Sequence, residues 1–443
     1  MNKKIKSFAV LAGVCILLIG LLGCSSGNEG TNEPSNESAN SGDASAKKEL
    51  IFWTLYKESS ANFEFFKTMG ERYTNEVDPS VEIVVESIPS SEYLGTKLIT
   101  AFAAGDGPDI FFVAPSTMLR YYNAGILKDL TDYIDREAKA DFAPTAFDVT
   151  TLDGKIYGIP YEQDLVGLAY DIDLFKENNM TPPTTWDEMK EDALKLATNT
   201  RAGLTFHITP DDHGVFIFSP FIWGTGGDIL SADRKTATLN SPGVKQALSY
   251  WRDLMVSGAL NKKPSRVSSD IGIIADGETA MQVMGSWGIA PLETTYPDRN
   301  IGIVPLPIPE GGTPVTVAGG WKIVANKDSD YADDAAKYIS WLFANPDPTS
   351  HVVWDTEVKF GLPVRNSVQE IAKDVYSKGL RKNYTEQILG TEKAEMRIPP
   401  EVSKIMQDMI QEALYKTDTS IDDIAEKYNQ KFEEFLKKYE GVM

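Results

Sequence analysis

Segments with the patterns of strands and helices alternate through residues 49–113, and this alternation restricts the fold more than any other feature of the sequence. Residues 49–55 (ELIFWTL) have the apolar composition of a buried strand. The segments that follow are a helix at 61–73, a strand at 81–86, a helix at 91–104 and a strand at 109–113. Strands that alternate with helices across short turns form a mostly parallel sheet with helices on both faces. We therefore predict an α/β fold.

The strand ends of this region are the first candidates for a binding site. Ligands of open α/β sheets bind beyond the carboxyl ends of the strands, which places residues 53–56 and 114–117 at that edge. Trp53, Tyr56 and Ser116 are therefore candidate contacts. A Trp at a strand end is also a common core residue, so both interpretations of Trp53 stay open.

The strand–helix order resumes after residue 160. An apolar strand at 165–170 precedes a helix and then a Pro-Pro break at 182–183. Thr185 and Glu188 have the spacing of a capping box, which predicts a further helix from residue 186. A second set of strands and helices therefore follows the first.

Aromatic residues and glycines gather in this second set. Trp223 precedes a group of glycines, and glycine lets a backbone approach a ligand closely. A strand at 280–284 leads into Gly-Ser-Trp-Gly at 285–288, where the two glycines leave the face of the Trp287 ring uncovered by neighbours in sequence. A rigid indole ring stacks well on the C–H face of a sugar. Trp287 is therefore a candidate ligand contact, with packing in the core as the alternative.

Metal and thiol chemistry find little support in the sequence. His207, Asp211, Asp212 and His213 are residue types that bind metals, but residues 209–212 have the composition of a turn, so we expect no metal and no cofactor. The chain has two cysteines, Cys15 and Cys24, and both precede the predicted folded segments. We therefore expect no disulfide and no thiolate metal site in the folded part.

The first 47 residues have the pattern of a bacterial lipoprotein. A basic start and a 15-residue apolar run at 8–22 predict a signal peptide over residues 1–23, because the run is too short to span a bilayer. Leu-Leu-Gly-Cys at 21–24 matches the lipobox and predicts lipidation of Cys24 after cleavage. Residues 24–47 then form a lipidated, disordered tether, since residues 25–46 contain no aromatic or large aliphatic side chain. The alternative is an uncleaved helical anchor.

Several motifs together resemble the extracellular solute-binding proteins, the maltose-type lipoproteins of ABC importers. The matching motifs are YGIP at 157–160, GDGPDIFFV at 105–113, GSWG at 285–288, VPLP at 304–307 with AGGW at 318–321, and GLPVR at 361–365. The resemblance covers the chain from about residue 49 to the C-terminus. It implies a two-lobed, type II periplasmic-binding-protein-like fold with three interlobe crossings. The implied lobes are residues 48–161 plus 318–360 and residues 162–317 plus 361–443.

The resemblance also places residues in a cleft between the lobes. The ligand-binding set that we predict is Trp53, Tyr56, Ser116, Glu162, Asp164, Trp223, Asp228, Trp287, Gly320, Trp321 and Arg397. A lone Arg near a crossing more often forms a solvated or interlobe pair, so Arg397 has that alternative. Some family members carry acidic or aromatic residues where this chain has Ala114, Pro115 and Ser116, so the exact ligand cannot be transferred.

The function implied is capture of a carbohydrate, expected to be an oligosaccharide, by hinge closure and its delivery to the permease subunits of an ABC transporter. A formal net charge of -21 argues against nucleic acid as a partner. We expect a monomer without enzymatic activity, held by lipid at the extracellular face of the cell membrane. Two alternatives stay open: a secreted glycoside hydrolase with paired carboxylates, and a binding protein for a peptide or polyamine.

Overall fold

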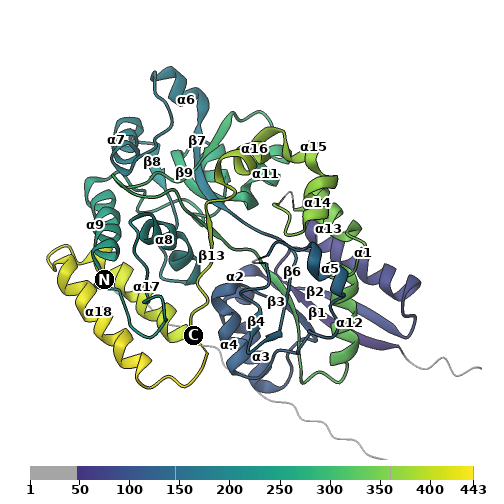
Figure 1. Ribbon diagram of the computed structural model, residues 1–443. Helices are drawn as coiled ribbons and strands as arrows, with labels where there is room; N and C mark the ends of the chain where they lie inside the picture. The colour runs from purple at the N-terminus through teal and green to yellow at the C-terminus, as the bar shows by residue number, and fades with distance from the viewer. Residues whose placement is uncertain (1–46, 145, 360, 443) are drawn as a thin grey trace, which may run out of the picture. The chain divides into compact units, whose positions relative to one another are not determined.

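Two β-sheets, each covered by helices, form the framework of the chain (Figure 1). The computed structural model describes residues 47–144, 146–359 and 361–442. The predicted signal peptide, the lipidation site Cys24 and nearly all of the tether lie outside the described residues. Within the described ranges, no helix combines the length and the apolar character that a membrane span requires.

The first sheet has the strand order β2-β1-β3-β12-β6. Its strands are β1 (Lys48–Thr54), β2 (Val81–Ser87), β3 (Ile110–Val113), β6 (Ile159–Pro160) and β12 (Lys322–Ala325). Its helices are α1 (Ala61–Glu76), α2 (Ser90–Glu92), α3 (Leu98–Ala104), α4 (Met118–Asn123), α5 (Arg136–Asp141), α12 (Ala332–Phe343) and α13 (Thr349–Val353). A short hairpin, β4 (Thr151–Leu152) with β5 (Lys155–Ile156), precedes β6. One hydrophobic core, which runs from Leu50 to Tyr161 and resumes at Ile323, holds these elements together.

The second sheet has the strand order β10-β7-β9-β8. Its strands are β7 (Val166–Asp171), β8 (Ala202–Thr205), β9 (Thr279–Gly285) and β10 (Ile301–Val304). The surrounding helices are α6 (Ile172–Glu177), α7 (Trp186–Leu196), α8 (Asp212–Gly224), α9 (Pro242–Ser257), α10 (Gly272–Ala275), α11 (Ile289–Thr294), α14 (Asn366–Ile371), α15 (Lys373–Tyr376), α16 (Gly379–Asn383), α17 (Pro400–Tyr415) and α18 (Ile421–Leu436). A separate two-stranded sheet joins β11 (Thr316–Ala318) to β13 (Glu392–Ala394). The last two helices pack with α9 (Figure 1).

Most strands of each sheet run in one direction, as predicted, but one strand in each sheet runs against its neighbours, so both sheets are mixed. In the first sheet, β12 is antiparallel to β3 and β6, and in the second sheet β7 is antiparallel to β9 and β10. The physical reason is the chain path. The strands β7 and β12 each begin where the chain arrives from the other sheet, so they run away from the crossings. Their neighbours run toward the crossings.

A local signal at Thr185 and Glu188 correctly predicted where α7 begins. The predicted capping box begins α7, with the Glu188 N–H donating to Thr185 Oγ1 (3.2 Å) and the Thr185 N–H donating to Glu188 Oε2 (3.1 Å).

The helix predicted at 91–104 is interrupted, because Gly95 has non-helical backbone angles (φ −82°, ψ −119°). Residues 90–104 therefore form α2, a wider π-type turn and α3.

Candidate ligand-binding site

A cavity of about 720 Å³ lies between the elements of the two sheets. Its size is within the range of roughly 300–1,000 Å³ that is typical of small-molecule sites. One wall comes from the loops and helices that follow β2 and β3, and the opposite wall comes from α8 and the turn after β9. The floor is made by the segments that connect the two sheets, including Asp164, Gly320 and Lys359.

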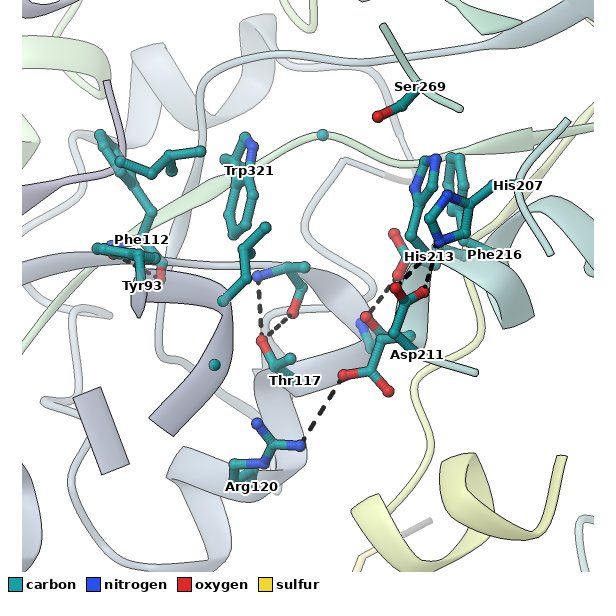
Figure 2. Close-up of a pocket in the computed structure, with 18 of the residues that line it drawn as sticks. Tyr93, Phe112, Thr117, Arg120, His207, Asp211, His213, Phe216, Ser269 and Trp321 are labelled. Atoms are coloured by element: carbon teal, nitrogen blue, oxygen red, sulfur yellow. Dashed lines mark hydrogen bonds and ion pairs between the residues drawn. The ribbon is translucent and has the colours of Figure 1, made fainter. Parts of the chain in front are cut away.

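The first wall presents aromatic side chains that are held in place by hydrogen bonds to the backbone and by contacts between rings. The Tyr93 hydroxyl donates to the Phe112 carbonyl (3.0 Å) and accepts from the Phe112 N–H (2.7 Å). The Trp321 ring stands almost perpendicular to the Tyr93 ring, at a centroid distance of 6.4 Å. Figure 2 shows these rings on one side of the cavity, above Thr117 and Arg120.

The opposite wall is built on the start of α8. Asp211 caps this helix by accepting from the Gly214 N–H (2.9 Å) and also contacts His207 Nε2 (2.9 Å). The His213 ring stacks on Phe216 at 5.6 Å and 19°. The helix therefore begins at the cavity because its capping residue is itself anchored by a buried histidine.

Trp287 completes this wall, with its ring 5.7 Å from His213. A β-carbon on Gly285 would lie 1.9 Å from Cζ3 of Trp287, so the indole ring lies over the bare backbone of Gly285. The glycine is required for this placement, since any other residue would displace the ring.

The floor contains a buried group of charges where the connecting segments meet. Lys359 Nζ lies 3.4 Å from Glu162 Oε2 and 3.6 Å from Asp164 Oδ2. Burial raises the pKa of Glu162, and the Lys359 ammonium opposes that effect. Burial by itself lowers the pKa of Lys359, but Asp164 and Glu162 raise it more, so Lys359 stays a cation. This ammonium therefore compensates carboxylates that burial would otherwise destabilise.

Polar contacts also bridge the two walls. Arg120 and Asp212 approach to 3.8 Å, and the Ser116 N–H donates to Glu395 Oε1 (3.2 Å). Burial raises the pKa of Glu395 to about 7. Arg397 Nη1 donates to three backbone carbonyls of residues 148–151, at 3.0–3.3 Å. Arg397 thus joins the two sides as a structural contact, which was the alternative considered for it.

Five of the predicted site residues line the cavity: Ser116, Asp164, Trp287, Gly320 and Trp321. Glu162 lies just beneath the floor, fully buried, and accepts the Trp321 N–H (3.1 Å). Whether these residues contact a ligand stays a prediction.

The other predicted residues lie elsewhere, each for a packing reason. Trp53 is 8% exposed and its Nε1–H donates to Glu86 (2.7 Å). Tyr56 is partly buried and stacks on Phe66 at the edge of the first core. Trp223 is buried in the second core because it lies seven residues, or roughly 10 Å along α8, from Phe216 at the cavity. Asp228 forms an ion pair with Lys393 (3.9 Å).

Sequence reasoning missed several residues of the cavity. Those absent from the predicted set include Tyr93, Arg120, His207, His213, Phe216, Lys359 and Glu395. A helix prediction for 212–224 would have placed Phe216 and Trp223 about two turns apart along the helix axis, but eleven consecutive residues, 214–224, are apolar or small and show no helical periodicity. Among the described residues, no group of three or more His, Cys, Asp or Glu side chains is arranged to hold a metal ion.

Comparison with known proteins identifies the family. A model of the bacterial extracellular solute-binding protein family matches residues 57–347. The chain belongs to this family. Among curated relatives, a maltotriose-binding protein of Pyrococcus abyssi is 25% identical over 317 residues, covering 69% of this chain and 65% of that protein. An ABC transporter extracellular-binding protein of Pyrococcus horikoshii is 24% identical over 306 residues, covering 67% and 69%.

Solved structures confirm the predicted two-lobed fold. The cyclic alpha-maltosyl-1,6-maltose binding protein from Arthrobacter globiformis has a TM-score of 0.71 and 26% identity, covering 89% of this chain and 100% of that chain. An ABC substrate-binding protein from Listeria monocytogenes, solved in complex with cycloalternan, has a TM-score of 0.75 and 22% identity, covering 88% and 99%. The two sheets described above are therefore the cores of two lobes, and the cavity lies between the lobes.

The floor generates a testable prediction about Gly320. Its φ of +98° suits glycine, and a β-carbon there would lie 2.6 Å from the backbone oxygen of Glu162. We expect Gly320→Ala to lower the free energy of unfolding by about 1–3 kcal/mol through backbone strain, and further through this clash. Chemical denaturation measures the change.

Gly154→Ala is the matched control, since Gly154 also has a positive φ (+77°) but open space around its β-carbon position. It introduces strain without the clash and should cost less than Gly320→Ala. Equal losses in the two variants would contradict the close approach of the connecting segments.

Proposed function

We propose that the protein binds an oligosaccharide in this cavity and delivers it to the permease subunits of an ABC transporter. The observation behind the proposal is that aromatic rings lie on both sides of the cavity, while the charged side chains that line it already have partners within the protein. Tyr93 and Trp321 stand on one side of the cavity and Trp287 and Phe216 on the other. Rings on both sides can cover the apolar faces of a sugar, while the polar atoms between them meet its hydroxyl groups.

The charges of the cavity favour an uncharged ligand. The charged side chains of the lining already have partners within the protein: Arg120–Asp212 (3.8 Å), Lys359–Asp164 (3.6 Å) and Lys404–Asp408 (2.6 Å). Asp211 is likewise engaged, by His207 Nε2 (2.9 Å). Glu395 accepts a hydrogen bond from Ser116. A polyamine would need a carboxylate that its ammonium groups could pair with, and the described lining residues keep theirs engaged. The peptide and polyamine alternatives are therefore weaker than the sugar.

The relatives give the first probe. The curated relative from Pyrococcus abyssi is named for maltotriose, and the Arthrobacter structure is named for a cyclic maltosyl-maltose. We therefore choose maltotriose as the first test ligand, together with maltose and longer glucans. A binder leaves these sugars intact, whereas a glycoside hydrolase releases shorter products.

Closure of the lobes is the proposed binding mechanism. The lobe boundaries that we propose are residues 48–161 plus 318–360 and residues 162–317 plus 361–443. The three connecting segments are then the hinge, and a ligand that touches both walls stabilises the closed state through its extra contacts there.

We further propose that the protein works from the outer face of the cell membrane as a lipoprotein. The lipobox at Cys24 supports this location, and the family is extracellular by description.

Trp287→Ala tests the proposed ligand contact. Loss of a central aromatic anchor typically costs about 2 kcal/mol, which corresponds to roughly 30-fold in affinity. We expect wild-type protein to bind maltotriose in calorimetry and the variant to bind it about 30-fold more weakly, with a nearly unchanged melting temperature. A variant that melts far below wild type, or that binds with full affinity, would assign Trp287 to the core.

Cys24→Ala tests the anchor. Without the thiol, no acyl chain can be attached, and stable anchoring requires more than one chain. We expect the variant in the soluble fraction with the melting temperature of the wild-type lobes. Retention in the membrane fraction after salt and carbonate washes would contradict the lipid anchor.

A further inference from the structure

Two histidines stand side by side at the cavity, and they differ in their hydrogen bonding. His207 has both ring nitrogens engaged, Nε2 with Asp211 (2.9 and 3.0 Å) and Nδ1 with the Ser268 hydroxyl (3.3 Å). Its neighbour His213, at a ring distance of 4.6 Å, has neither a hydrogen bond nor an ion pair to any described residue. His213 nevertheless lines the cavity, as Figure 2 shows.

The ring of His213 is held in place by packing. Phe216 stacks on it at 5.6 Å, and the Trp287 ring stands against it at 5.7 Å and 64°. The His207 ring closes a further side at an angle of 72°, and Asp211 holds His207 there. His213 is thus oriented by three neighbours, while its nitrogens stay available to whatever enters the cavity.

The imidazole of His213 is uncharged at physiological pH. Burial, together with a smaller effect of His207, lowers its pKa to about 3, although Asp211 opposes the shift. A neutral imidazole carries one N–H donor and one lone-pair acceptor. A hydroxyl group, which also donates and accepts, can pair with either nitrogen.

We propose that His213 is a specificity-determining residue that hydrogen-bonds a hydroxyl group of the bound sugar. This assignment rests on the proposed function. It makes one hydroxyl position of the ligand indispensable, because a sugar without it would leave a buried nitrogen unpaired. Such a loss typically costs roughly 10- to 100-fold in affinity. Sites that pair with a particular hydroxyl reject analogues that lack it far better than apolar sites reject extra bulk.

Two substitutions separate hydrogen bonding from packing. His213→Phe keeps a ring against Phe216 and Trp287 but removes both nitrogens, whereas His213→Gln keeps a donor and an acceptor without the ring. We expect the Phe variant to bind maltotriose roughly 10- to 100-fold more weakly than wild type by calorimetry. The Gln variant should bind more tightly than the Phe variant. Full affinity in the Phe variant, or weaker binding by Gln than by Phe, would overturn the assignment.

Monodeoxy analogues of maltotriose add a readout that a purely structural role would not move. In wild type, the analogue that lacks the paired hydroxyl should bind roughly 10- to 100-fold more weakly than maltotriose. In His213→Phe, that same analogue should bind as well as maltotriose, because the interaction is already absent. If every analogue loses the same factor in both proteins, His213 pairs with no hydroxyl.

His351→Phe is the matched control, since this His is buried among rings of the first lobe, 4.8 Å from Phe343 and away from the cavity. Its affinity for maltotriose should equal that of wild type, and melting temperatures without ligand are compared for all variants.

If wild type binds another oligosaccharide of the screen instead, that sugar and its deoxy analogues replace maltotriose. Wild type that binds no sugar contradicts the proposed function itself, whereas normal sugar binding by His213→Phe contradicts only the assignment of His213.

Discussion

The arrangement of the two lobes depends on the contact between the three chain segments that connect them. The first and second segments are joined by the Gly319 N–H, which donates to the Asp164 carbonyl (2.9 Å), and by the Trp321 N–H, which donates to Glu162 (3.1 Å). The first and third are joined by Gln163 and Leu362, whose backbones pair at 3.3–3.4 Å. Lys359 lies against both acids from the third segment. Because breaking a buried ion pair typically costs about 3–5 kcal/mol, these contacts hold the three connecting segments together.

The connecting segments also explain which parts of the fold could be predicted from the sequence. Strand and helix positions follow local patterns, so the strands at 49–55, 81–86 and 109–113 were predicted to within one residue and the capping box at Thr185 was predicted correctly. The helix predicted at 91–104 is interrupted at Gly95. Strand direction depends on where the chain comes from, and no local pattern records that β7 and β12 arrive from the other lobe. The mixed sheets therefore required the three-dimensional path, even though the resemblance had indicated three crossings.

The candidate site could be predicted where close approach of the backbone requires glycine, because glycines are visible in the sequence. Gly320 and the glycines around Trp287 mark places where a chain or a ring approaches closely, and Gly320 and Trp287 themselves line the cavity. Trp53 and Trp223 are tryptophans like Trp287, but both are buried in the cores of the lobes. Lys359 was missed because its partners, Glu162 and Asp164, belong to a distant segment. His213 was missed because the sequence does not show that Trp287 lies beside it. The site thus combines a wall fixed by local turns with polar groups that only the folded chain brings together.

Hinge closure on a sugar is the central claim of this account, and small-angle X-ray scattering tests it most directly. The radius of gyration of the soluble protein is measured without ligand and with maltotriose at a concentration that calorimetry shows to be saturating. A ligand that contacts both walls should draw the lobes together, so the account predicts a smaller radius of gyration in the complex. An unchanged radius in the saturated complex would show that the sugar binds without closing the lobes and would contradict the account.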